Sequence, residues 1–115
     1  MSVLFNHTLL DAAATDETAV VESLEVGEKI PDTGFTHTIE WGTGVTAGVV
    51  EIEGNNVSAT YAGTWANINT VTYAAGAPKS EYVYSPATFQ FMRHRISTAV
   101  ANGTVTTHMS GIING

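Results

Sequence analysis

Histidine is the residue type in this sequence best suited to bind a metal ion or to transfer protons near neutral pH. The chain has four histidines, and none forms the His-x-His or His-x-x-x-His spacing that presets a metal site. Cysteine is absent, so thiolate ligands and disulfides are excluded. His37 and His94 fall on apolar faces of alternating segments, which predicts hydrogen-bonded histidines in or near the core. We expect no metal and no cofactor.

Carboxylates are the next candidates for chemistry. Glu51 and Glu53 lie two positions apart, and Glu40 lies in another segment. Two such acids could hydrolyse a glycosidic bond from separations of about 5–9.5 Å, but that chemistry needs an aromatic-lined cleft, and this short chain lacks the long loops to build one. We therefore expect Glu51 and Glu53 to be solvated acids on a strand face. None of the seven serines lies in a Gly-x-Ser-x-Gly elbow, so the sequence indicates a protein that is not an enzyme.

Two other groups could bind ligands. Asp11, Asp16 and Glu17 form an acidic segment without the Asp-x-Asp-x-Asp-Gly spacing of a calcium loop. The aromatic residues could form a sugar-stacking platform, although core packing and subunit contacts are the simpler interpretation. They are Trp41, Trp65, Tyr61, Tyr73, Tyr82 and Tyr84. Tyr82 and Tyr84 flank one residue close to Pro86, which predicts an edge strand available for contact.

Strands must position these side chains, because amphipathic helical periodicity is weak along the chain. Short β-branched or alternating segments recur every 8–12 residues or so, separated by turn signals such as Gly54-Asn55-Asn56 and Asn102-Gly103. The segments are 19–26, 35–41, 46–53, 57–61, 68–73, 81–84, 88–98 and 104–110. This pattern predicts an all-β fold, an antiparallel β-sandwich or jelly roll. We expect a single β-sandwich domain over 19–115, preceded by an N-terminal arm or first strand over 1–18.

Composition narrows the possible partners. The 115 residues carry a net charge of −7 with only four Lys and Arg, which disfavours binding to nucleic acid or to an anionic membrane. Residues 1–57 hold ten of the eleven acids, whereas Arg93 and Arg95 lie on one late strand. This division suits an interface between subunits. It equally suits pairing within the chain, with Arg93 or Arg95 against Glu51 or Glu53 on neighbouring strands.

Several motifs in order resemble a group of small virion proteins of tailed bacteriophages. In those proteins a strand reading V-x-L-E-G-S is followed by a D-G-x-x-W turn, an R-Y-V-R-A-R-I-S strand and a closing G-T-V-T strand, and the opening resembles Thr8–Thr15. The corresponding segments here are Gly48–Gly54, Trp65–Ile68, Phe89–Ser97 and Asn102–Thr106. One departure is the longer stretch Gly54–Thr64, which makes the turn at Asn55 and Asn56 a candidate contact surface.

The resemblance implies a β-sandwich that acts as a capsid decoration, or cement, protein. Such a protein would be synthesised in the host cytoplasm, bind the major capsid protein on the outer surface of the virion and form homotrimers or homodimers. The candidate contact residues are Tyr82, Tyr84, Arg93, Arg95, Asn55 and Asn56. The alternatives are a jelly-roll module that binds glycans or a host surface, and another virion part such as a head fibre or tail component.

Overall fold

The computed structural model describes residues 2–15, 21–23, 34–76, 79–85 and 89–114, and these ranges contain strands and turns but no helix. In particular, no described helix is long and apolar enough to cross a membrane. The strands are β1 (Ser2–Ala13), β2 (Val21–Ser23), β3 (Phe35–Trp41), β4 (Ala47–Asn55), β5 (Ala66–Thr72), β6 (Ser80–Ser85), β7 (Phe91–Ala101) and β8 (Val105–Asn114).

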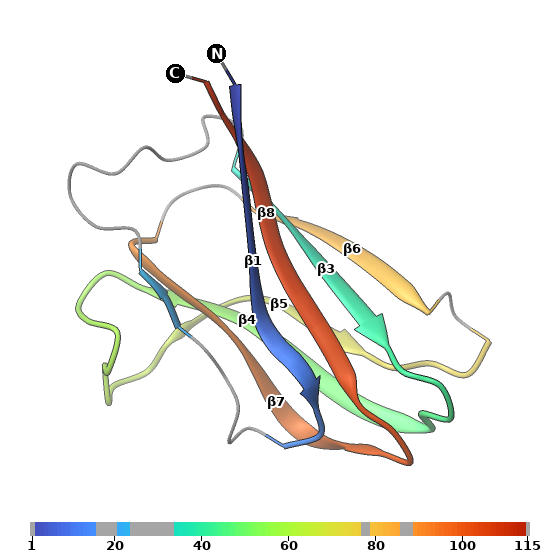
Figure 1. Ribbon diagram of the computed structural model, residues 1–115. Helices are drawn as coiled ribbons and strands as arrows, with labels where there is room; N and C mark the ends of the chain where they lie inside the picture. Colours follow the sequence, from blue (N-terminus) through green and yellow to red (C-terminus); the bar gives the residue numbers. More distant parts are fainter. Residues whose placement is uncertain (1, 16–20, 24–33, 77–78, 86–88, 115) are drawn as a thin grey trace.

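The strands form two four-stranded antiparallel sheets that face each other (Figure 1). Sheet A has the order β1-β8-β3-β6, and sheet B has the order β2-β7-β4-β5. Every connection along the chain crosses between the sheets except the one from β4 to β5, which joins neighbours in sheet B, and these two strand orders are those of an eight-stranded jelly roll. The predicted fold class, an all-β sandwich of jelly-roll type, is confirmed.

Alternation along the strands builds the core between the sheets. In β3, Phe35, His37, Ile39 and Trp41 are buried, while the residues between them are partly or fully exposed. The same period of two appears in β7, because a strand directs successive side chains to opposite faces of its sheet. One apolar cluster includes Leu10, Ile39, Trp41, Val50, Ile52, Ile96 and Val105, and a second consists of Leu9, Phe35, Met92 and Met109.

Two turns show how local sequence shapes the sheets. The predicted hairpin at Asn102-Gly103 joins β7 to β8, and Asn102 has a φ of 62°, a left-handed conformation that asparagine tolerates. Residues 57–61, by contrast, were expected to form a strand, and this expectation is wrong. Asn55 Oδ1 accepts the backbone N–H groups of Val57 and Ser58, so this segment turns instead of extending the ladder.

The N-terminal segment is a strand over Ser2–Ala13, which pairs with β8. The expected domain boundary at residue 18, the acids Asp16 and Glu17, and most of the expected strand 19–26 lie outside the described residues. Strand β3 pairs with β8 only from Trp41 to Thr36, which lies opposite Ser110. Beyond that point β1 and β8 continue as a two-stranded ribbon that projects from the sandwich and ends at both termini (Figure 1).

Candidate functional site

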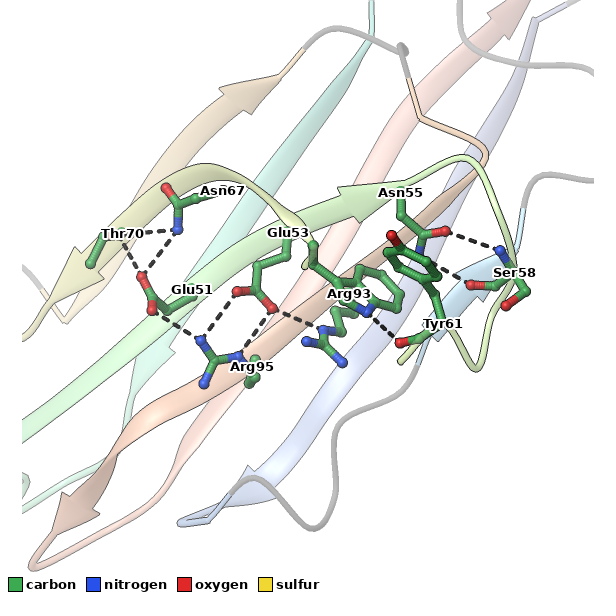
Figure 2. A network of polar contacts seen from close by, with 10 residues as sticks. Glu51, Glu53, Asn55, Ser58, Tyr61, Asn67, Thr70, Arg93 and Arg95 are labelled. Atoms are coloured by element: carbon green, nitrogen blue, oxygen red, sulfur yellow. Dashed lines mark hydrogen bonds and ion pairs between the residues drawn. The ribbon is translucent and has the colours of Figure 1, made fainter. Parts of the chain in front are cut away.

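The outer face of sheet B carries a network of ion pairs between β4 and β7 (Figure 2). Glu53 Oε1 accepts hydrogen bonds from Arg93 Nε at 2.9 Å and Arg95 Nε at 3.0 Å. Arg95 Nη2 donates to the carboxylates of both Glu53 and Glu51 at 3.2 Å. The intramolecular pairing of these arginines, one of the two interpretations of the charge division, is therefore confirmed.

Glu53 is more enclosed than the sequence suggested. Its side chain is only 8% exposed, so the expectation of a solvated acid is wrong for this residue. Burial alone would raise the pKa of Glu53, but the hydrogen bonds and charges of Arg95 and Arg93 outweigh it and leave that pKa below its usual value. The Arg93 guanidinium carbon also lies 4.0 Å from the ring centroid of Trp65, a cation–π contact that covers the network.

Glu51 completes the network at its other end. Its Oε1 accepts hydrogen bonds from Thr70 Oγ1 at 2.6 Å and from Asn67 Nδ2 at 3.1 Å, both on β5. A glycosidase acid needs a raised pKa, so that it holds a proton to donate. Glu53 has the opposite arrangement, because two arginines stabilise its ionised form. Glu51 and Glu53 of β4 therefore link three strands of sheet B, because their partners lie on β5 and β7.

The two asparagines singled out as contact residues have different surroundings. Asn55 is buried, and its side-chain amide also donates to the carbonyl oxygen of Ser58 at 3.1 Å, so it holds the turn together. Asn56 is exposed, and its Oδ1 accepts the backbone N–H of Gln90 at 2.7 Å. Asn55 therefore has a structural role, and Asn56 ties the β4–β5 connection to the start of β7.

The outer face of sheet A has a different character. Tyr82 and Tyr84 on the edge strand β6 are 71% and 63% exposed. They lie opposite Thr38 and Thr36 of β3, which lie in turn opposite His108 and Ser110 of β8. We call these six residues the tyrosine–hydroxyl face. None of the six is Asp, Glu, Lys or Arg, but Glu40 borders them on the same outward side of β3, where its Oε2 lies 3.8 Å from His108 Nε2.

The broader aromatic platform is not present. Trp41 and Trp65 are 3% and 7% exposed, so neither can stack on a sugar in this conformation. The Trp41 indole N–H donates to Glu81 Oε2 at 2.7 Å, and its ring meets Tyr73 edge-on. The Trp65 indole N–H donates to the carbonyl oxygen of Tyr61 at 2.9 Å. Core packing is confirmed for Trp41, whereas Trp65 is buried against Arg93 on the outer side of sheet B, and Tyr82 and Tyr84 are the exposed pair.

The interior holds a chain of four fully buried polar side chains, which we call the histidine chain. Ser85 Oγ lies 2.6 Å from His37 Nε2, His37 Nδ1 lies 2.7 Å from His94 Nε2, and His94 Nδ1 lies 2.7 Å from Thr107 Oγ1. The Leu10 backbone N–H also donates to Thr107 Oγ1 at 3.2 Å. His94 belongs to sheet B and the other three side chains belong to sheet A, so the chain links the two sheets.

All the hydrogen bonds of the histidine chain can form when both imidazole rings are neutral. A neutral imidazole has one N–H and one acceptor nitrogen, so a single proton between His37 and His94 satisfies both facing atoms. Burial lowers the pKa of His37 to about 4. Burial, reinforced by the charges of His37 and His108, lowers the pKa of His94 well below its usual value. The sequence correctly placed both histidines in the core, but Ser85 and Thr107 gave no signal, because their roles depend on contacts between distant strands.

Two further findings concern metal binding and similarity to known proteins. In the described ranges, no group of three or more His, Asp or Glu side chains could hold a metal ion. No protein-family model matches the chain, and its sequence matches that of no curated protein.

The first prediction is that acid weakens the fold before any carboxylate is protonated. The unfolded chain binds protons at His37 and His94 near pH 6.5, whereas the folded chain does not, so stability is full above pH 6.5 and falls toward pH 4. The loss is up to about 1.4 kcal/mol per pH unit for each histidine. Glu53 contributes in a separate window, below pH 4.5, because its folded pKa is lowered. Urea unfolding between pH 7.5 and 4.5 measures the loss.

Two variants distinguish the contribution of the histidine chain to the pH dependence of stability from the contribution of other groups. His37→Leu should lower stability at pH 7 and flatten the pH dependence, whereas His7→Gln, which replaces an exposed histidine of β1, should leave that slope unchanged. Equal stability of the natural chain at pH 7.5 and pH 5 would contradict the role of the buried pair.

The second prediction concerns the ion-pair network. Glu53→Gln leaves Arg93 and Arg95 without their shared buried carboxylate, and it should reduce the free energy of unfolding by about 2–3 kcal/mol. The matched variant Glu51→Gln removes a more exposed carboxylate with one ion pair, and it should cost about 1 kcal/mol or less. Equal losses in urea unfolding at pH 7 would show that Glu53 is not the centre of the network.

Proposed function

We propose that this protein is a capsid decoration protein of a tailed bacteriophage, which binds the major capsid protein on the outside of the shell and stabilises it without catalysis. The ordered motifs that resemble small phage virion proteins support this proposal. So does the jelly-roll fold, which recurs in viral capsid proteins and in lectins. Because one fold serves many functions, the site must supply the rest of the argument.

The observation that carries the proposal is the exposed tyrosine pair on a sheet face that is mostly uncharged, with Glu40 at its border. Tyr82 and Tyr84 are two of the three large apolar side chains exposed in the described part of the chain. Tyrosine is enriched where proteins bind each other, because its ring supplies contact area and its hydroxyl can still find a partner. Both residues lie on β6, an edge strand of sheet A, to which an extended segment of a partner can add by β-augmentation.

The charge distribution favours the same face. Arg93 and Arg95, which the sequence offered as contact residues, are engaged by Glu51 and Glu53 on sheet B. A partner that docked there would have to cover or break ion pairs. A partner at Tyr82 and Tyr84 would cover less charge, because the acid beside this face, Glu40, lies at its border and its side chain is 51% exposed. Many copies of a small module bound this way would stabilise a shell by mass action.

Glycan binding is the second candidate, and one observation favours it. Tyr82 and Tyr84 stand two positions apart on the same face, beside the hydroxyls of Thr36 and Thr38. Stacking rings next to hydroxyl groups could bind a chain of sugars. Binding of the purified protein to a glycan panel, lost in the Tyr82→Ser, Tyr84→Ser double variant, would favour this function if the same protein does not bind capsids.

The third prediction tests the capsid proposal. The natural chain should bind purified expanded capsids of the same phage at a fixed number of copies per lattice site, and it should raise their resistance to heat. The Tyr82→Ser, Tyr84→Ser double variant should bind about a thousandfold more weakly, because buried tyrosines are frequent hot spots and two of them at about 2 kcal/mol each amount to about 4 kcal/mol.

A matched control is available on the opposite side of the molecule. Val57 is 67% exposed on the β4–β5 connection, and Val57→Ser should leave capsid binding unchanged. Circular dichroism establishes that each variant is folded. Failure of the natural chain to bind expanded capsids would overturn the proposal, and loss of binding in the Val57 variant would move the contact to sheet B.

A further inference from the structure

The histidine chain ends on β6, the edge strand of sheet A. Ser85 is the last residue of that strand, and its Oγ lies 2.6 Å from His37 Nε2 in the interior. Among the described strands, β6 pairs with β3 alone, whereas β3 pairs with both β6 and β8. The strand with the fewest neighbours in this part of the sheet is therefore bonded to a titratable ring.

Two side-chain hydrogen bonds connect β6 to the interior, one toward each end of the strand. Ser85 bonds to His37 at the last residue, and Glu81 Oε2 accepts the indole N–H of Trp41 near the first. Between them Val83 lies opposite His37 and is half-buried. Loss of the bond at Ser85 therefore frees the end of β6 that covers His37.

The hydrogen-bonding capacity of the two imidazoles limits how many protons the histidine chain can hold. With both rings neutral, one N–H lies between His37 Nδ1 and His94 Nε2, which are 2.7 Å apart. One added proton breaks no bond, because the hydroxyls of Ser85 and Thr107 can each accept from a ring N–H. A second added proton puts an N–H on both facing nitrogens. Two donors cannot stay in hydrogen-bond contact, so the doubly protonated rings must separate.

We propose that the histidine chain is an acid-sensitive latch for β6: protonation of His37 and His94 separates the two rings and detaches β6 from β3, while the other strands of the sandwich remain paired. His94 lies on β7, between β2 and β4 of sheet B, and β3 lies between β8 and β6 of sheet A. Detaching β6 breaks the pairing of one edge strand, whereas any other route to water separates strands with two neighbours. The edge is thus where water reaches the charged rings at the lowest cost.

The surroundings of the two rings do not compensate a positive charge. Every hydrogen bond of His37 and His94 ends within the histidine chain, whose other members are uncharged. The titratable and charged side chains described on the surrounding strands are His7 and Asp11 of β1, Glu40 of β3, Glu51 and Glu53 of β4, Glu81 of β6, Arg93 and Arg95 of β7, and His108 of β8. Of these, the charge of His108 acts against protonation of His94.

The direction of the pH effect follows from the two states of the latch. Burial lowers the pKa of His37 to about 4 when the latch is closed, whereas rings exposed to water bind protons near pH 6.5. The closed state is therefore favoured above pH 6.5 and loses its advantage as the pH falls toward 4. The open state gains up to about tenfold per pH unit for each histidine that becomes exposed.

Opening of the latch would also dismantle the tyrosine–hydroxyl face, because Tyr82 and Tyr84 lie on β6 and the remaining members lie on β3 and β8. Acid would then release a partner from that face. This consequence rests on the proposed function, whereas the latch is a property of the protein alone and is tested without a partner.

The experiment measures amide hydrogen exchange of the full chain by NMR between pH 7.5 and pH 5.5, as protection factors corrected for the intrinsic pH dependence of exchange. Protection of the β6 amides should fall about tenfold if one histidine is exposed in the open state, and about a hundredfold if both are. Strand β5, the edge strand beside β4 in sheet B, is the internal control, and its protection should change less than about twofold.

Two variants test whether the histidines cause the change. His37→Gln cannot take up a proton, so it should abolish the pH dependence of β6 protection. Ser85→Ala keeps both histidines but removes the bond to β6, and it should lower β6 protection already at pH 7.5 while β5 stays protected. Equal loss of protection in β5 and β6, or β6 protection that is independent of pH, would overturn the proposal. So would an unchanged pH dependence in His37→Gln or unchanged β6 protection in Ser85→Ala.

Discussion

The fold depends on joining two sheets through a polar link without a disulfide. His94 bonds to His37 and to Thr107 across the interior, and His37 bonds to Ser85 beyond it. No buried side-chain nitrogen or oxygen among the described residues lacks a partner. A slip of one residue in β3 or β7 would move its histidine to the outer face and leave the partners unsatisfied. The histidine chain therefore fixes the registers of both sheets together, which apolar packing alone specifies less sharply.

The same constraint determines which surfaces remain for other molecules. Because His37 and His94 use the inward face of their strands, the neighbouring outward positions carry the surface chemistry. On β7 these positions hold Arg93 and Arg95, and the facing acids of β4 neutralise them. On β3 they hold threonines, and the adjacent edge strand holds two exposed tyrosines. One side of the sandwich is thus closed by ion pairs, and the other is mostly uncharged, with Glu40 at the border of the exposed tyrosines.

Much of this arrangement was predictable from the sequence, and the remainder has physical reasons for being hidden. Alternation with a period of two predicted β3 and β7 and placed His37 and His94 in the core, because burial on one face of a strand repeats every second residue. The Arg–Glu pairing was one of two interpretations, since opposite charges on neighbouring strands attract.

The meeting of the two histidines was not predictable, because it joins residues 57 positions apart on different sheets. The turn signal at Gly54-Asn55-Asn56 was recognised, but the strand expected over 57–61 is absent, because the side-chain bonds of Asn55 that continue the turn leave no periodic signal. The ribbon was also missed, because it depends on where β3 stops pairing.

Sheet A carries the surface proposed for recognition, and the histidine chain helps to hold that surface in place. Ser85 ends β6, the strand that bears Tyr82 and Tyr84, and its hydroxyl lies 2.6 Å from His37 Nε2. The edge strand is thus tied to the core at one end, so its exposed face has less conformational freedom to lose when a partner binds. A module of this kind would suit a surface that repeats one site many times, because the occupancy of each site depends only on its affinity and on the free concentration of the module.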